Sequence, residues 1–255
     1  EAAAFLRWQE RKFIDVERLY ARIWRTALSS LDLNEMAKAF RELGIDGKSC
    51  KTLQDAKSIA DDFVLSNQRP FNRIALAILF LAIPRHLQSS MIQRWSIGNY
   101  PPLVYYAPYA AHVLSVEVFF QIALAANLIS SERPSNRTDI GYLFYLPFAM
   151  VFVSSDKLHK KCAPLFLRQD QEFIWGPDLK EGLRQANNYY SGLPLATQER
   201  GIMSFADDPP QDNLILTQIW DRHFPNISRS GERKGPQAPY KDEALVKKLK
   251  EFTDA

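Results

Sequence analysis

The sequence predicts an α/β protein with a short parallel sheet flanked by helices and a mostly helical N-terminal region. Two observations carry this prediction. In the first hundred residues, apolar side chains recur at steps of three and four with charged residues between them, which is typical of amphipathic helices. Further along, short apolar runs bounded by turn signals alternate with helix-length segments. That alternation favours parallel strands joined by helices.

Five helices are predicted in the N-terminal region. The apolar period and the positions of Gly44, Pro70 and Pro84 as helix ends or starts place them over residues 4–30, 32–43, 52–66, 72–83 and 85–95. Two consecutive prolines at 101–102 then mark a boundary. The segment "LVYY" at 103–106 follows, and its β-branched and aromatic residues indicate a short strand.

The second half of the chain alternates between helix and strand. A helix is expected at 110–129, and another at 139–146, capped by Asn136 or Thr138 and ended by Pro147. The expected elements that follow are a strand at 149–155, a helix at 157–167 capped by Asp156, a strand at 172–176, and helices at 177–192, 214–224 and 242–252. The domains predicted from this order are a helical region (1–100), an α/β core (101–192), a helical extension (193–228), and a linker with a short helix (229–255).

The composition is that of a globular protein with a substantial core. The 255 residues are 46% hydrophobic and 24% charged, and the net charge of +3 neither indicates nor excludes a nucleic-acid partner. Cys50 and Cys162 match no metal spacing and no disulfide framework, which predicts a reducing, cytoplasmic location. The apolar runs at 74–84 and 142–153 are shorter than the roughly 20 residues that span a bilayer, so no membrane association is expected.

Asp139 and Asp156 are the first candidate functional residues. Asp139 opens a predicted helix and Asp156 ends the strand that returns along it, so the two carboxylates are expected at the same end of the unit. In open α/β sheets, ligands bind beyond the C-terminal strand ends. Two adjacent carboxylates repel unless a cation or a proton neutralises them, and hard cations such as Mg²⁺ or Mn²⁺ favour such oxygens. The alternative is that both aspartates only cap helices.

Glu117 is a third candidate. It lies in the apolar helical segment "HVLSVEVFFQIALA", where its neighbours at three and four residues are Val113, Leu114, Phe120 and Gln121. A carboxylate in such surroundings needs a partner, because burying it alone is costly. A metal ion, an arginine or a backbone donor would each supply one, and an exposed helix edge would need none.

The segment "NRTDIGYLFYLPFAMVFVSSDKLH", followed by "EFIWGPDLKEGL", resembles the C-terminal half of PIN-like nuclease domains. The resemblance covers about residues 103–183, roughly a third of the chain. It implies a metal-dependent ribonuclease that uses Mg²⁺ or Mn²⁺ and hydrolyses RNA phosphodiester bonds. The implied roles are metal ligation by Glu117, Asp139 and Asp156, and orientation of ligands or water by Asn136, Ser154 and Ser155.

Lys157 and His159 follow Asp156 and would contact phosphate in such a substrate, although side chains of this kind more often form a solvated helix face. The sequence departs from the family at the first strand, which in the family ends in an aspartate, whereas "LVYYAPYA" holds no acid. This first acid precedes Glu1, comes from elsewhere in the chain, or is absent. Its absence would favour the alternative function, a non-catalytic interaction module whose helical region binds a protein partner.

Overall fold

Helices dominate the part of the chain that the computed structural model describes, which comprises residues 2–29, 32–35, 38, 50–66, 70–199 and 215–223. Contacts divide the chain into unit 1, Glu1–Phe173, and unit 2, Ile174–Ala255, so the division falls within a strand. The predicted domain limits at 100, 192 and 228 follow a different division and stay predictions. The helices predicted at 32–43 and 242–252 lie mostly or wholly outside the described residues.

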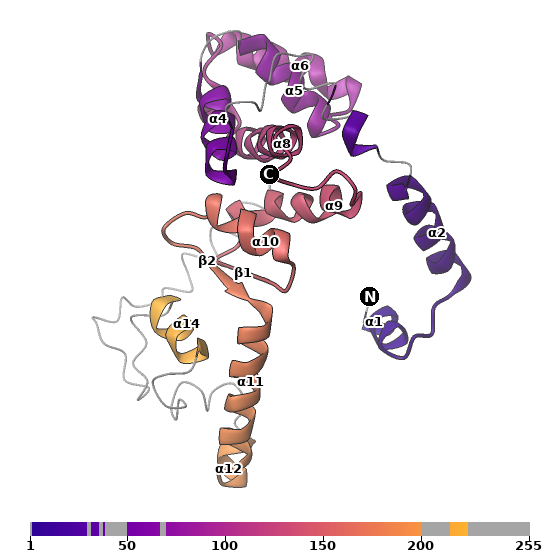
Figure 1. Ribbon diagram of the computed structural model, residues 1–255, viewed down its shortest axis with the longest axis vertical. Helices are drawn as coiled ribbons and strands as arrows, with labels where there is room; N and C mark the ends of the chain where they lie inside the picture. Colours follow the sequence, from indigo (N-terminus) through magenta and orange to yellow (C-terminus); the bar gives the residue numbers. More distant parts are fainter. Residues whose placement is uncertain are drawn as a thin grey trace, which may run out of the picture. The chain divides into compact units, whose positions relative to one another are not determined.

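The described elements of unit 1 are helices followed by one strand and part of a second (Figure 1). The helices are α1 (Ala2–Gln9), α2 (Asp15–Ser29), α4 (Leu53–Leu65), α5 (Pro70–Phe80), α6 (Arg85–Ile97), α7 (Leu103–Tyr106), α8 (Pro108–Ala125), α9 (Ser135–Gly141) and α10 (Lys157–Cys162), with the 3₁₀ helices η2 (Tyr142–Phe148) and η3 (Ala163–Leu165). The strands are β1 (Val151–Ser154) and β2 (Glu172–Trp175).

Helix α8 forms the centre of unit 1. It packs against α4, α5, α7 and η2, and Figure 1 shows α4 and α5 beside it. Its side chains are buried from Val113 to Leu124 on every face. Complete burial of a side chain such as Phe119 contributes roughly 2–3 kcal/mol relative to exposure. Burial all round explains why this helix has no polar face, in contrast to the amphipathic α4 beside it.

By length and composition, α8 meets the requirement for a membrane span, and within the described residues it is the helix that does so. Its most apolar window of 18 residues has a mean hydropathy of 1.3 and is 72% buried inside the structure. A core helix enclosed by its neighbours has these same properties. The expectation of no membrane association therefore stays a prediction.

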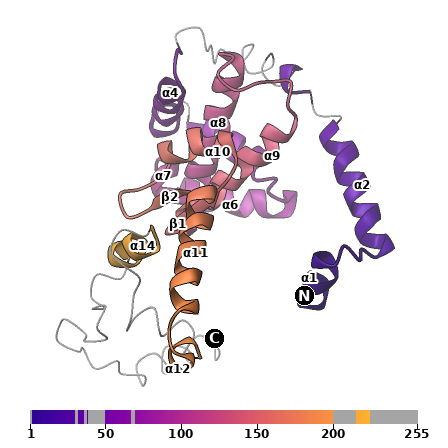
Figure 2. The same ribbon diagram turned by 60° about the horizontal axis from the view of Figure 1, so that its bottom comes forward.

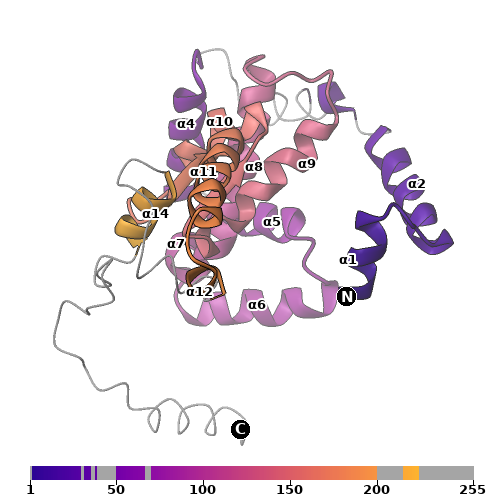
Figure 3. The same cartoon turned by 90° about the horizontal axis from the view of Figure 1, so that it is seen from below.

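Local sequence signals explain several helix boundaries. Thr52 caps α4 through a capping box, in which its side chain accepts a hydrogen bond from the Asp55 N–H and the Asp55 carboxylate accepts one from the Thr52 N–H. Helix α6 begins after Pro84, as predicted, and lies beside α5 and α7 (Figure 3). Trp95 of α6 is buried against the ring of Phe71 from α5 and donates a hydrogen bond to the Pro101 carbonyl at 2.8 Å.

The strands β1 and β2 form the sheet of the described chain, and they run parallel, as predicted. A parallel pair needs a crossover connection, which α10 and η3 supply. Figure 2 shows α10 beside α9, on the path between the two strands. The structure is thus a mostly helical α/β mixture, with the strands where the turn-bounded apolar runs place them.

Unit 2 contains the end of β2 followed by α11 (Gly176–Ser191), α12 (Leu195–Gln198) and α14 (Ile215–His223). Pro177 lies in the first turn of α11, as predicted. Helix α14 packs against α11 at Gly182, where a Cβ atom would lie 2.3 Å from Ile215 Cγ2. Glycine therefore permits the close approach of these two helices.

Three predictions about local structure are wrong. The single helix predicted at 4–30 is broken between α1 and α2, where Arg11 adopts a φ of 58° and the Ile14 N–H binds the Glu17 carboxylate at 2.9 Å. The segment "LVYY" is not a strand but α7, because it follows Pro102 and packs Leu103 into the core beside α8. Tertiary contacts there outweigh the strand preference of valine and tyrosine.

The third error concerns the helix predicted at 139–146. Helix α9 begins at Ser135 after Pro134, without a side-chain cap, and changes to 3₁₀ geometry at Tyr142. Asn136 is therefore an internal residue of α9, not its cap, and Thr138 does not cap it either. The Pro147 that was expected to end the helix is accommodated inside η2, since a proline removes only one hydrogen-bond donor from this short segment.

Candidate functional site

Asp156 lies at the C-terminal end of β1 and begins the next helix. Its carboxylate accepts hydrogen bonds from the Leu158 N–H at 2.6 Å and the His159 N–H at 3.4 Å, so it caps α10. The capping role read from the sequence is confirmed. Only Oδ1 is used in these two bonds, which leaves the second carboxylate oxygen without a part in the cap.

His159 links the strand end to α9. Its Nε2 lies 2.6 Å from the Asp139 carbonyl oxygen, which can only accept, so Nε2 carries the proton. In the neutral imidazole, Nδ1 then accepts from the Ser154 hydroxyl at 2.7 Å, while Ser154 Oγ accepts from the Asp156 N–H at 3.0 Å. A continuous chain of hydrogen bonds therefore holds Asp156, Ser154, His159 and Asp139 in one place.

Asp139 and Asp156 influence each other electrostatically. Burial raises the pKa of Asp139 above its ordinary value, and the neighbouring negative charge of Asp156 raises it further. His159 and Arg133 oppose both effects. The contact that links the two residues is His159, which binds the Asp139 carbonyl and, through Ser154, the Asp156 N–H.

Glu117 lies in a different environment from the two aspartates. Its side chain is 0% exposed, and its Oε1 forms an ion pair with the Arg137 guanidinium of α9. Burial raises the pKa of Glu117, and the charge of Arg137 and its hydrogen bond oppose that rise. Oε2 is buried and has no hydrogen-bond partner within the described chain, and the same is true of both amide atoms of Gln121, one turn further along α8.

The residues described here contain no group of three His, Cys, Asp or Glu side chains that could hold a metal ion. Glu117, Asp139 and Asp156 thus do not form a three-carboxylate cluster in this structure, and Arg137 supplies the partner that Glu117 needs. Asp139 and Asp156 are the two carboxylates that the fold brings together. Metal binding stays a prediction, which now depends on this pair.

The residues expected to bind substrate differ in accessibility. Asn136 is buried, and its side-chain amide donates to the Ser130 carbonyl at 2.8 Å, while Ser154 and His159 serve the hydrogen-bond chain described above. Ser155 and Lys157 are exposed next to Asp156. Of these residues, Ser155 and Lys157 are the ones whose side chains a ligand at the strand end would reach without a change in the structure.

Arg137 is the residue of this region that the sequence analysis missed. It lies two positions before Asp139, and the only sequence signal for it is that a buried glutamate on a neighbouring helix needs a compensating partner. Arg137 also lines an open cavity of about 500 Å³ whose wall includes Tyr142, Phe144 and Tyr145 of η2, together with Trp24 of α2. The guanidinium thus connects the buried Glu117 to an aromatic surface beside Asp139.

A second polar group links α4 to α8. Asp61 forms an ion pair with Lys57 and accepts a hydrogen bond from the Ser115 hydroxyl at 2.7 Å, beside a cavity of about 370 Å³ that His112 also lines. The Lys57 ammonium group lies 4.7 Å from the centre of the Phe166 ring. The polar groups of these residues bind one another, so their role is to stabilise the packing of α4 against α8.

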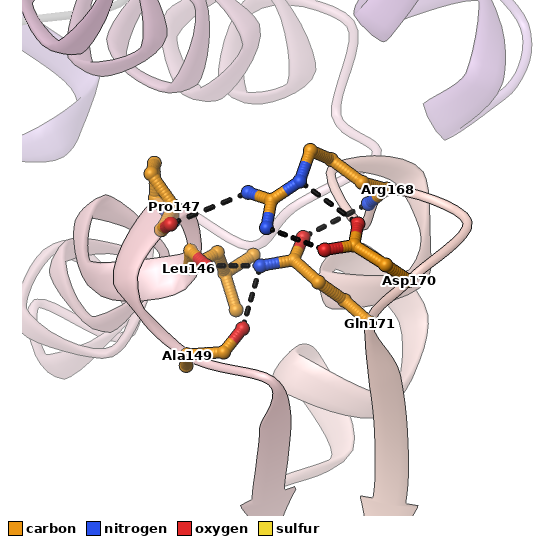
Figure 4. Close-up of polar contacts among 6 residues, drawn as sticks. All are labelled: Leu146, Pro147, Ala149, Arg168, Asp170 and Gln171. Atoms are coloured by element: carbon orange, nitrogen blue, oxygen red, sulfur yellow. Dashed lines mark hydrogen bonds and ion pairs between the residues drawn. The ribbon is translucent and has the colours of Figure 1, made fainter. Parts of the chain in front are cut away.

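The loop before β2 fixes the C-terminal end of η2 (Figure 4). The side-chain amide of Gln171 donates to the carbonyls of Leu146 and Ala149, and its oxygen accepts from the Arg168 N–H at 2.9 Å. Arg168 in turn donates to the Pro147 carbonyl at 3.3 Å and pairs with Asp170. These contacts replace the backbone hydrogen bonds that the end of a 3₁₀ helix lacks, and they hold η2 in position.

The structure is a mostly helical α/β mixture in which a buried histidine, His159, links Asp139 of α9 to Asp156 at the end of a parallel strand. Comparison of the chain with protein-family models, with curated proteins and with solved structures finds no match.

Proposed function

We propose that this protein is a metal-dependent nuclease that hydrolyses RNA phosphodiester bonds, with Asp139 and Asp156 as its essential carboxylates. The observation that supports this proposal is the hydrogen-bond chain through His159 and Ser154, which links the Asp139 carbonyl on α9 to the Asp156 N–H at the C-terminal end of β1. Placing like charges together is unfavourable unless a cation or a proton compensates. The strand end is also where ligands bind in open α/β sheets.

The two aspartates fit Mg²⁺ or Mn²⁺, because hard cations bind carboxylate oxygens and Mg²⁺ is usually held by one or two carboxylates together with substrate phosphate. Asp156 retains one oxygen that the α10 cap does not use. When bound there, such an ion supplies a water of lowered pKa and neutralises developing charge on the phosphate. Glu117 fits less well, since Arg137 already binds one of its oxygens.

Residues near Asp156 would bind the substrate phosphate and position the two aspartates. Lys157 is exposed directly after Asp156 and carries the charge that attracts a phosphate. Ser155 is exposed beside it and offers a hydroxyl. Ser154 and His159 link the backbones of the two aspartates through the hydrogen-bond chain, so we assign them a positioning role rather than direct contact with substrate.

The substitution that tests the proposal is Asp156→Asn. Asparagine caps helices as well as aspartate does, so the start of α10 is preserved while the charge is lost. We expect Mg²⁺-dependent cleavage of single-stranded RNA by the wild type to fall more than about 100-fold in the variant, because an ion's contribution of several kcal/mol is lost. Asp62→Asn, at an exposed aspartate of α4, is the matched control and should cleave like the wild type.

Three measurements complete this test. Cleavage should stop in EDTA and return with Mg²⁺ or Mn²⁺, and the melting temperature of Asp156→Asn should match that of the wild type. Cleavage that persists in EDTA, or that is equal in Asp156→Asn and the wild type, would rule out the proposed mechanism.

The alternative is a non-catalytic module that binds a protein partner through its helical region. The observation that favours it is the apolar surface of α1 and α2, where Phe5, Trp8, Leu19, Ile23 and Trp24 are all exposed. Pairing of Glu117 with Arg137 agrees with a site that has no third carboxylate. A purified chain that cleaves no RNA with either metal, at any pH from 6 to about 9, would favour this alternative.

A further inference from the structure

The 3₁₀ helix η2 exposes three aromatic side chains in a row. Residues three apart lie on the same side of a 3₁₀ helix, and the pattern of "YLFYLPF" follows this period. Leu143 and Leu146 are buried in the core, whereas Tyr142, Tyr145 and Phe148 are 53%, 65% and 73% exposed. We call these three residues the aromatic ladder.

The spacing of the aromatic ladder suits a regular ligand. A 3₁₀ helix rises about 2.0 Å per residue, so successive rings project about 6 Å apart along it. This separation is comparable to the distance between successive bases of an extended single strand. Stacking on aromatic side chains is the common way in which proteins bind unpaired bases without reading their sequence.

Each end of the aromatic ladder is fixed. At the first end, the Tyr142 ring meets the His159 ring edge-on at 5.7 Å, and His159 binds the Asp139 carbonyl. At the other end, the Gln171 and Arg168 contacts hold the backbone around Pro147 (Figure 4). The rings are therefore presented by a fixed backbone, which lowers the entropic cost of binding.

Three arginines flank the aromatic ladder, of which Arg137 also pairs with Glu117 and Arg168 with Asp170. Arg137 lines the same cavity as Tyr142 and Tyr145, and Arg133 is near enough to Asp139 to lower the pKa of its carboxyl. Arg168 lies at the Phe148 end, where its side chain is half exposed. Arginines that flank exposed rings favour a ligand with phosphates and bases over a purely apolar partner.

We propose that the aromatic ladder is a binding site for single-stranded RNA, in which unpaired bases stack on Tyr142, Tyr145 and Phe148 while the flanking arginines contact phosphates. The RNA would run along η2 and reach the Asp139–Asp156 pair at the Tyr142 end. This inference rests on the proposed function for the identity of the ligand, but binding at the ladder requires neither the metal nor cleavage.

The test measures binding in EDTA, so that cleavage plays no part. Fluorescence anisotropy of a short fluorescein-labelled oligouridine is compared for the wild type, Tyr145→Ala and Phe148→Ala. Each variant should bind about 5- to 100-fold more weakly, the range expected when one stacking ring is removed. Tyr145→Phe keeps the ring and should restore binding. Tyr105→Ala is the control, because Tyr105 is 81% exposed on α7 but lies outside the ladder.

An abasic oligonucleotide of the same length separates stacking from charge. It should bind the wild type more weakly than the oligouridine and should bind Tyr145→Ala and wild type equally. Wild-type affinity in both alanine variants, or equal affinity for the abasic strand, would overturn the proposal. The proposal would also be overturned if oligouridine did not bind and the aromatic ladder instead bound a second copy of the chain or lipid vesicles.

The outcomes also separate this proposal from the nuclease proposal. Ladder-dependent binding without cleavage in Mg²⁺ or Mn²⁺ would leave the ladder supported and rule out the nuclease. Metal-dependent cleavage together with unchanged RNA binding by the alanine variants would support the nuclease and rule out the aromatic ladder as the binding site.

Discussion

Glu117 and the Asp139–Asp156 pair show how differently one fold treats acidic residues. Glu117 is enclosed in the core, and a guanidinium from the next helix compensates its charge. Asp156 caps α10 at the end of β1, and Asp139 lies in α9, where burial and the charge of Asp156 raise its pKa. A buried acid with an arginine partner is explained by stability alone, whereas two coupled acids leave negative charge that a ligand can use.

The largest effect is expected at the buried pair. Arg137→Met leaves the Glu117 carboxylate buried without its partner and should lower the free energy of unfolding by about 3–5 kcal/mol. Replacing both residues by methionine should restore most of that loss, since no charge is then buried. Urea unfolding measures both, with Arg94→Met, an exposed arginine of α6, as the control. Equal stability of the single and double variants would show that Glu117 does not depend on Arg137.

A smaller loss is expected at the residue that joins the two aspartates. His159→Ala removes hydrogen bonds to Ser154 and the Asp139 carbonyl, and should cost about 2 kcal/mol in unfolding free energy. It should also weaken Mn²⁺ binding measured by calorimetry, because the backbone segments that carry the two carboxylates are no longer linked. His86→Ala, at an exposed histidine of α6, should change neither quantity. Unchanged Mn²⁺ affinity in His159→Ala would mean that His159 has only a structural role.

The smallest effect concerns titration of the aspartate pair. In Asp156→Asn, the pKa of Asp139 should fall towards its ordinary value near 3.8, because the neighbouring charge is gone. A carboxyl whose folded pKa is raised stabilises the fold below its unfolded pKa, and this contribution is lost as pH rises through the folded pKa. Unfolding free energy should therefore depend less on pH just above 3.8 in the variant. Carbon-13 NMR titration of the carboxyl carbons measures the shift, and an unchanged Asp139 pKa would show that the pair is not coupled.

The sequence predicted much of the fold because its signals are local. Thr52, Asp156 and Pro177 mark the starts of α4, α10 and α11, and the two turn-bounded apolar runs became β1 and β2. The errors have tertiary causes. "LVYY" became α7 because Leu103 packs into the core, and residues 142–148 became a 3₁₀ helix anchored by Gln171 from a distant loop.

The candidate site was predictable only in part. Asp139 and Asp156 are linked through His159, and Glu117 did require a partner. The identity of that partner was an open choice between a metal, an arginine and a backbone donor, and the structure supplies Arg137. The hydrogen bonds of His159 were not predictable, because a histidine three positions after an aspartate gives no sign that both ring nitrogens are used.

The sequence by itself determined the positions of β1 and β2, most of the described helices, and that a carboxylate in an apolar helix needs compensation. These properties follow from the period of apolar residues and from caps within a few positions. Only the tertiary structure decided that Arg137 neutralises Glu117 and that His159 holds the Asp139 carbonyl. Each of these pairs joins residues 20 positions apart, and such contacts depend on how helices pack rather than on local propensity.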